Sequence, residues 1–199
     1  MSTISELETP VVLVDLDKAE ANLKKAQDAA DRAGIKLRPH IKTHKLPRFA
    51  KRQVELGAVG ITVQKLGEAE VMADAGLDDL LLTFNIVGAK KRDRLKALHE
   101  RVTIRVVADS TETVTGLAET FTDQNRPLGV FVECDTGMGR CGVQSPEAAL
   151  SLARQIAVLP GLSFAGLMTY PAAKKYREAA DWLAEAKALF DSAGMPLPE

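Results

Sequence analysis

Short apolar runs alternate with amphipathic stretches along most of the chain. The runs are rich in valine, isoleucine and leucine, and apolar and polar residues alternate little within them. That pattern is typical of parallel strands covered on both faces, so it predicts a strand at each run. Six such runs begin near Leu37, Val59, Leu80, Val102, Leu128 and Leu162.

The stretches between the runs carry apolar residues at helical spacing, and several of them end at a glycine. A glycine just past the last turn accepts the left-handed backbone that closes a helix. Ser145-Pro146-Glu147 has the form of a helix start, with a hydroxyl cap, a proline and then an acidic residue. Helices are predicted, among others, over 16–33, 47–56, 68–75 and 176–193.

Repeated strand–helix units with short links imply a parallel sheet with right-handed crossovers. Six consecutive units favour a (β/α)8 barrel, the TIM-barrel type of α/β fold, over an open doubly wound sheet, since no Gly-x-Gly-x-x-Gly motif follows the first run. Residues 11–15 would suit an extra strand of another layer. Residues 194–199 resemble the lead-in to a further strand, so we expect 1–199 to be one incomplete barrel domain, truncated before its seventh strand, in a fragment of a longer protein.

Composition narrows the class of protein. The 199 residues carry a formal net charge of −1, which gives no general attraction for nucleic acid or for an acidic membrane surface, so we expect neither partner. The sequence contains no apolar run as long as a membrane helix, and residues 1–6 lack the pattern of a signal sequence. Two cysteines, Cys134 and Cys141, do not make a disulfide framework, so a cytoplasmic location is expected.

The segment 38–45, Arg-Pro-His-Ile-Lys-Thr-His-Lys, is the strongest candidate for chemistry. The proline favours extended backbone before it, and side chains alternate along an extended segment. Arg38, His40, Lys42 and His44 would then share one face, which suits an anionic cofactor, and a lysine among them could act as an amine nucleophile. The alternative is a solvated basic edge strand. The spacing of the two histidines suits a metal site only on a helix, so no metal site is predicted here.

Polar residues follow the other predicted strands, where the functional side chains of a barrel gather. Gln64 and Tyr170 each have an alternative role, in satisfying backbone groups or in packing. Arg140 lies on a glycine-rich loop and is harder to explain as structural. The polar residues at the strand ends are Gln64, Lys65, Thr83, Asn85, Asp109, Cys134, Asp135, Thr169 and Tyr170.

Four blocks of sequence resemble one known family. They are 9–17, with Thr-Pro and then Val-Asp-Leu-Asp; 38–45; 57–70, from Gly-Ala-Val-Gly to Gln-Lys-Leu-Gly-Glu-Ala-Glu; and 135–143, Asp-Thr-Gly-Met-Gly-Arg-Cys-Gly-Val. The chain resembles the D-threonine aldolase and D-serine dehydratase group, whose barrel is of the alanine racemase N-terminal type (fold type III pyridoxal-phosphate enzymes).

The resemblance implies pyridoxal 5'-phosphate as cofactor, with Lys42 forming the Schiff base. It implies that Arg140 faces the pyridine nitrogen and that Tyr170 lies at the ring or phosphate side. His40 and Gln64 would line the pocket, with His40 and Lys42 as the catalytic residues.

The activity implied is that of a lyase on β-hydroxy D-amino acids, cleaving them to glycine and an aldehyde. Dehydration of D-serine, amino-acid racemisation, a non-catalytic barrel that carries the cofactor, and an inactive fragment remain as alternatives. Members of the group are commonly homodimers, so we expect a homodimer at full length.

Three features depart from the family pattern. The phosphate-binding loop expected after a seventh strand would lie beyond Glu199. The ligands of the divalent metal expected in the full-length family, in a C-terminal β-domain, would lie there too. The stretch 169–172, Thr-Tyr-Pro-Ala, also lacks the histidine–glycine pair that many members carry after the tyrosine.

Overall fold

A single parallel sheet forms the centre of the molecule. The computed structural model describes residues 3–198. The sheet has five strands in the order β1-β2-β3-β4-β5, and each pairs in parallel with its sequence neighbour. The strands are β1 (Ile61–Val63), β2 (Asp79–Leu82), β3 (Thr103–Ala108), β4 (Leu128–Cys134) and β5 (Leu162–Thr169).

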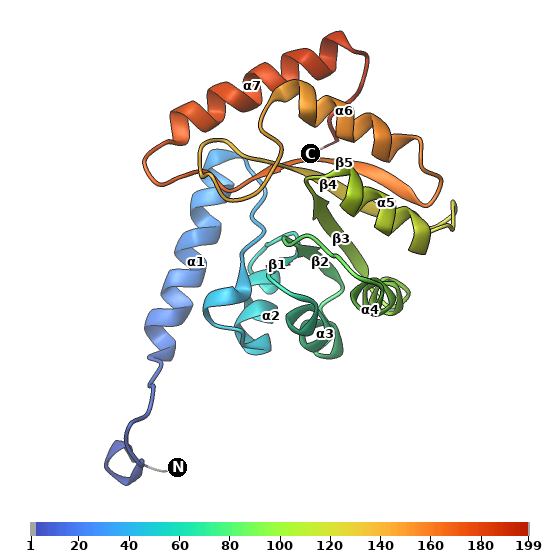
Figure 1. Cartoon of the computed structure of the whole chain (residues 1–199). Coiled ribbons are helices and arrows are strands. Elements are labelled where there is room, and N and C mark those ends of the chain that lie inside the picture. Colours follow the sequence, from blue (N-terminus) through green and yellow to red (C-terminus); the bar gives the residue numbers. More distant parts are fainter. Residues whose placement is uncertain (1–2, 199) are drawn as a thin grey trace.

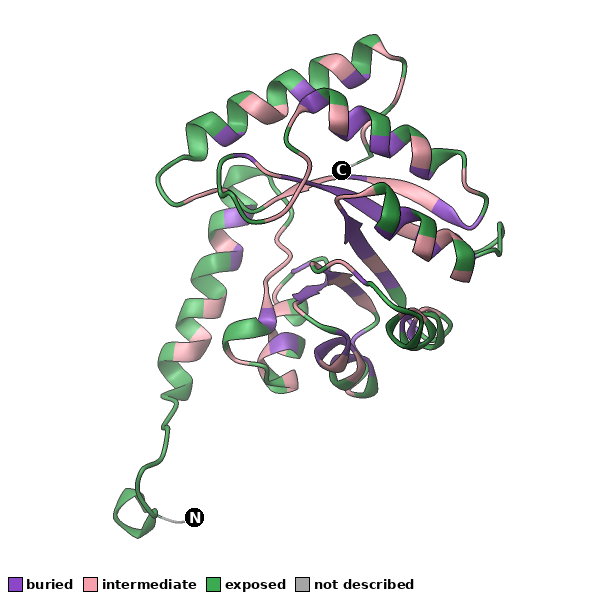
Figure 2. Ribbon diagram, in the orientation of Figure 1, coloured by how far each residue is buried: buried purple, intermediate pink, exposed green. Residues whose placement is uncertain are grey.

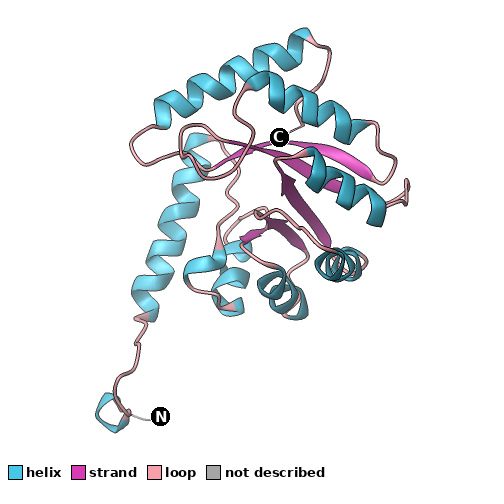
Figure 3. Cartoon of the chain, in the orientation of Figure 1, coloured by secondary structure: helices cyan, strands magenta, loops and turns pink. Residues whose placement is uncertain are grey.

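A helix connects each strand to the next along the outside of the curved sheet, and further helices precede the first strand and follow the last (Figures 1 and 3). The α-helices are α1 (Leu16–Ala33), α2 (Pro47–Glu55), α3 (Leu66–Asp74), α4 (Ala89–His99), α5 (Thr111–Thr120), α6 (Pro146–Ala157) and α7 (Tyr176–Ser192). Strand order that follows chain order, with every crossover on one side, is that of a (β/α) barrel wall, so the predicted fold class is confirmed and the five strands form an open part of such a barrel.

The helix ends agree with the signals in the sequence. The helix predicted over 16–33 is α1, which Asp15 caps by accepting a hydrogen bond from the backbone N–H of Lys18, and Gly34 closes it in the left-handed conformation. At α6 the hydroxyl of Ser145 accepts from the N–H of Ala148, as the predicted helix start requires. The helix predicted from residue 68 begins two residues earlier, at Leu66.

The first predicted strand does not form, and this corrects the sequence prediction. Residues 37–40 run beside β1, with a single bridge between His40 and Thr62, and a 3-10 helix, Ile41–Thr43, follows at once. The His40 side chain accepts a hydrogen bond from the backbone N–H of Lys42. This bond starts the turn, and the hydrogen bonding between the segment and β1 does not continue past it. The alternation of side chains expected over 38–45 therefore holds only as far as His40.

The apolar stretch 11–15 also forms no strand. It is extended and exposed, with Val12 89% accessible, and follows a 3-10 helix, Ile4–Glu6. Figure 1 shows this N-terminal part leading away from the barrel before α1. The prediction of an extra strand in another layer is therefore wrong for the structure described here.

The hydrophobic core lies between the sheet and the surrounding helices, and Figure 2 shows the strands buried or half-buried and the outer helix faces exposed. Ile61, Leu80 and Ile104 are in register on neighbouring strands and are at most 1% exposed. Burial of each such side chain contributes about 1.5–3 kcal/mol. Within residues 3–198, none of the helices combines the length and the apolar character needed to cross a bilayer.

Candidate active site

A cavity of about 380 Å³ opens at the carboxyl ends of the strands, on the inner side of the sheet. It brings together residues from segments more than a hundred positions apart, among them the five site residues predicted from the sequence. The lining residues are Arg38, His40, Lys42, Thr62, Gln64, Leu81, Thr83, Glu133, Arg140, Met168, Thr169 and Tyr170.

Two cations lie near the ring of Tyr170. The Nζ atom of Lys42 is 5.1 Å from the ring centroid, and the guanidinium carbon of Arg140 is 5.2 Å from it. Both distances are within the range of cation–π attraction. The lysine and the arginine predicted to face a common ligand therefore do share one aromatic surface.

Lys42 sits on a turn that His40 holds in place. The Nδ1 atom of His40 accepts the backbone N–H of Lys42 at 3.2 Å, and its Nε2 atom lies 3.2 Å from Oε1 of Gln64. An acceptor at Nδ1 leaves the ring proton on Nε2, so His40 donates to Gln64. Burial lowers the pKa of His40, which favours this neutral form. Because both ring nitrogens are engaged, this arrangement offers no free nitrogen for proton transfer.

Gln64 joins the end of β1 to the end of β2. Its Oε1 accepts from His40, and its Nε2 donates to the carbonyl oxygen of Thr83 at 3.4 Å. The sequence left open whether Gln64 only satisfies a backbone group. It does bind the backbone carbonyl of Thr83, and it also lines the cavity.

Arg140 is carried by a loop that one carboxylate organises. Asp135 Oδ1 accepts hydrogen bonds from the backbone N–H groups of Gly137, Met138 and Gly139, at 2.8 to 3.0 Å. These bonds, above all the one from Gly139, hold the pKa of Asp135 below its ordinary value. Asp109 closes the far side of the loop by accepting from the N–H of Gly142 at 3.1 Å.

Glu133 is a cavity residue that the sequence reasoning missed. It is only 3% exposed, and its Oε1 accepts from the thiol of Cys141 at 3.0 Å. Burial raises the pKa of Glu133. The available signal was an acidic residue within the otherwise apolar run of β4.

Arg38, which lines the cavity, belongs to a second group of charges that sequence reasoning did not connect. Asp79 Oδ1 lies 2.7 Å from Nη1 of Arg38 and 3.0 Å from Nη1 of Arg105. A side chain at Gly60 would collide with Arg38 and with the backbone oxygen of Asp79. The glycine thus lets the arginine reach its partner.

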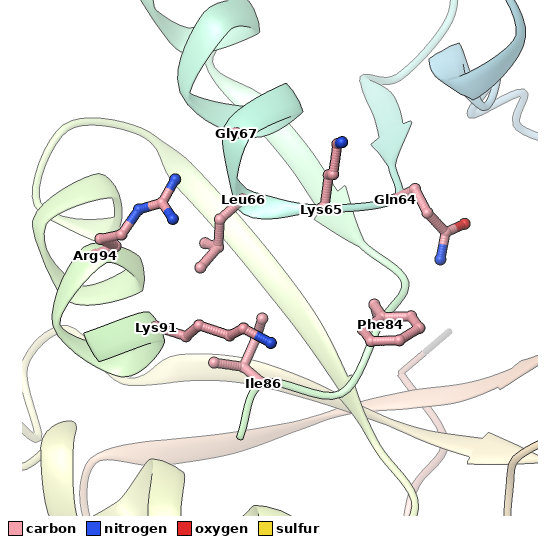
Figure 4. A pocket seen from close by; sticks show the side chains of 8 residues that line it. All are labelled: Gln64, Lys65, Leu66, Gly67, Phe84, Ile86, Lys91 and Arg94. Atoms are coloured by element: carbon pink, nitrogen blue, oxygen red, sulfur yellow. The ribbon is translucent and has the colours of Figure 1, made fainter. Parts of the chain in front are cut away.

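Other predicted residues lie outside this cavity. His44 packs edge-on against Phe49 and accepts the N–H of Leu46, so it does not join Lys42. Lys65 lines a neighbouring cavity of about 520 Å³, shown in Figure 4, which shares only Gln64 with the first and is also lined by Lys91 and Arg94 of α4. Among the described residues, no three His, Cys, Asp or Glu side chains gather as a metal site.

Fold and cavity together define a (β/α)-barrel domain that presents a lysine, an arginine and a tyrosine where its strands end. The chain belongs to the alanine racemase, N-terminal domain family, whose model matches residues 14–196, and this confirms the resemblance found in the sequence.

Known relatives are similar over most of the chain. It is 39% identical to a D-threonine aldolase of Arthrobacter sp. over 84% of its own length and 44% of that protein. It is 36% identical to a 3-hydroxy-D-aspartate aldolase of Paracoccus denitrificans, over 95% of this chain and 49% of that one. The crystal structure of D-threonine aldolase from Filomicrobium marinum matches with a TM-score of 0.93 and 34% identity, over 98% of this chain and 56% of that chain. The chain thus spans about half the length of these relatives.

Proposed function

We propose that this chain is the cofactor-binding barrel of a pyridoxal-phosphate-dependent lyase that acts on β-hydroxy D-amino acids, with Lys42 as the residue that binds the cofactor covalently. The observation that carries the proposal is the shared placement of the Lys42 amine and the Arg140 guanidinium on the Tyr170 ring, inside one cavity. The names of the aldolases with which the chain shares most of its length support the substrate class.

The side chains around the cavity suit this cofactor. Pyridoxal phosphate carries an aldehyde and an anionic group, and the cavity offers one primary amine together with the cationic side chains of Arg38 and Arg140. Tyr170 adds an aromatic face, and Gln64 adds an amide held by two hydrogen bonds. When bound, the cofactor would supply an electron sink for the substrate carbon that bears the amino group.

The residues of the chain then have distinct roles. Lys42 provides the amine, and His40 fixes the turn that presents it. Arg140 would face the pyridine nitrogen of the cofactor, where its positive charge would keep that nitrogen unprotonated. In the aldol cleavage a base would take the proton of the β-hydroxyl group while the Cα–Cβ bond breaks and an aldehyde leaves, and the Cα carbon would then take up a proton to give glycine. His40 was predicted to be catalytic, and its two hydrogen bonds favour the role of holding Lys42 in place.

Dehydration is a second candidate function. The chain is 32% identical to a D-threo-3-hydroxyaspartate dehydratase of Delftia sp., over 76% of this chain and 40% of that protein. The two reactions give different products from the same substrate class, an aldehyde with glycine or a keto acid with ammonia. Product analysis on β-hydroxy D-amino acids therefore separates them, and product chirality would reveal a racemase.

The cofactor assignment has a direct test. The protein is incubated with pyridoxal phosphate and reduced with borohydride, and the pyridoxyl-modified peptide is mapped by mass spectrometry. Lys42 should carry the label, Lys42→Ala should lose it, and Lys51→Ala should keep it. A label on another lysine in the parent protein would refute the assignment. Labelling without any product from β-hydroxy D-amino acids would favour a non-catalytic carrier instead.

A further inference from the structure

Both ends of the turn that carries Lys42 are tied to one short segment at the end of β1. Before the turn, His40 is hydrogen-bonded to the side chain of Gln64. After the turn, Lys45 forms an ion pair with Glu68, with Nζ 3.0 Å from Oε1. Gln64 and Glu68 are themselves joined, because the backbone N–H of Gln64 donates to Oε2 of Glu68 at 2.8 Å.

Glu68 is the centre of this arrangement. Its side chain is 7% exposed, and each carboxylate oxygen has its own partner, the backbone N–H of Gln64 or the amine of Lys45. Burial alone would raise the pKa of Glu68, but the hydrogen bonds from Gln64 and Lys45 outweigh it and hold that pKa below its ordinary value. The group is therefore a buried carboxylate that keeps its charge at neutral pH.

Lys45 adopts a backbone conformation that a lysine rarely takes. Its φ angle is 53°, in the left-handed region, which costs a residue with a side chain about 1–2 kcal/mol. The backbone N–H of Lys45 donates to the carbonyl oxygen of Ile41 at 2.8 Å and so closes the turn around Lys42. The ion pair with Glu68 offsets part of the conformational cost and holds the chain in this closed form.

We propose that Glu68 is a positioning residue for Lys42. By holding Lys45 with one oxygen and Gln64 with the other, it fixes both sides of the reactive turn, and hence the position of the amine against Tyr170. The assignment rests on the function proposed for Lys42. The reactive amine must be held in a narrow range of positions to attack an aldehyde at a useful rate, and an error of 1 Å can cost as much as 100-fold.

A role for Glu68 in stability alone must be separated from a role in positioning Lys42. Glu68 lies in the first turn of α3, where a carboxylate also stabilises the helix. Replacing Glu68 would disturb both roles, so the test changes its partner Lys45. Lys45→Met removes the charge but keeps most of the aliphatic stem, and Lys45→Arg restores the charge. Lys51→Met, which removes an exposed charge from the neighbouring helix α2, serves as the matched control.

The measurement is the rate at which Lys42 is modified, followed by absorbance, trapped with borohydride and mapped by mass spectrometry. Two probes are used, pyridoxal phosphate and pyridoxal, because the second lacks the phosphate that a lysine could attract directly. Lys45→Met should slow modification roughly tenfold with both probes. Lys45→Arg should recover most of the rate, Lys51→Met should match the parent, and the melting temperatures should stay alike.

Three results would overturn the assignment alone: equal rates for Lys45→Met and the parent, a slowing seen only with pyridoxal phosphate, or a slowing accompanied by a lower melting temperature. A parent protein that never forms the Lys42 adduct would overturn the proposed function, and this assignment with it.

Discussion

The amine of Lys42 lies over the face of the Tyr170 ring, with Nζ 5.1 Å from the ring centroid. The two residues are far apart in the sequence, one on a turn before β1 and the other just after β5. Since Tyr170 is half-exposed, the aromatic face is open to solvent and to a ligand as well as to the amine. The ring and the amine thus line the same cavity.

Replacing Tyr170 tests whether the ring face or the hydroxyl matters. Tyr170→Leu should weaken pyridoxal-phosphate binding roughly two- to fivefold, since an exposed cation–π contact contributes about 0.5–1 kcal/mol. Tyr170→Phe should stay close to the parent, because it keeps the ring. Dissociation constants from absorbance titrations give the comparison, and Tyr176→Leu, at an exposed tyrosine outside the cavity, is the control. Equal losses in the Phe and Leu variants would assign the effect to the hydroxyl.

Glu133 should control the reactivity of its neighbour Cys141. Burial, followed by the hydrogen bond to Glu133, raises the pKa of the Cys141 thiol. Glu133→Gln removes the negative charge, so the pKa of Cys141 should fall and alkylation by iodoacetamide at neutral pH should become severalfold faster.

Cys134 should stay inert in this experiment, because burial raises its pKa to about 12. Peptide mapping after alkylation separates the two thiols, and Cys141→Ser should abolish the fast phase. Unchanged alkylation of Cys141 in Glu133→Gln would contradict the link between the two residues.

His40 should make stability depend on pH. Burial lowers the pKa of His40 below its ordinary value of 6.5, so the unfolded chain takes up a proton at a higher pH than the folded one. The resulting stability is complete above pH 6.5 and is lost as the pH falls toward the folded-state pKa. The urea midpoint should therefore drop between about pH 7 and pH 5, and His40→Asn should reduce that drop.

His44 provides the matched comparison, since burial lowers its pKa as well. His44→Asn should remove a separate part of the dependence on pH, and the double variant should be the flattest of the set. A His40→Asn variant with the same pH dependence as the parent would show that His40 protonates equally in both states.

Gly60 should tolerate no side chain. Its φ is +145°, and a Cβ atom there would lie 2.6 Å from the backbone oxygen of Asp79 and would also meet Arg38. Gly60→Ala should destabilise the protein by about 3 kcal/mol in urea unfolding, combining backbone strain with the collision.

Gly88→Ala separates these two costs. Gly88 also has a positive φ, of +92°, but no heavy atom lies within 4 Å of its Cβ position. This variant should lose only the backbone contribution, about 1–2 kcal/mol. Equal losses of unfolding free energy in the two variants would mean that Arg38 and Asp79 can move away from the new Cβ atom at Gly60 without destabilising the protein.

Local signals in the sequence sufficed for the helices and the class of fold. The capping residues Asp15 and Ser145 and the glycine Gly34 act on backbone groups a few positions away, so their effects can be predicted from neighbours in the chain. The repetition of apolar runs likewise indicated a parallel barrel wall, because strands that are covered on both faces consist almost entirely of apolar residues.

The same local reasoning failed at residues 40–43, where a side chain competes with the backbone. Extended backbone was the sound expectation after a proline, but His40 binds the N–H of Lys42 and turns the chain. That preference depends on Gln64, which orients the histidine from another segment.

Some residues of the cavity could be predicted from the sequence, and others were identified only from the tertiary structure. The sequence by itself determined that Gln64 and Tyr170 follow directly after strands, because the chain order of a barrel puts those strand ends on one rim. Only the tertiary structure decided that Glu133 is buried beside Cys141 and that Glu68 joins both sides of the Lys42 turn. Such contacts depend on distances between separate segments, to within a few tenths of an ångström, and residue type and spacing along a chain do not encode them directly.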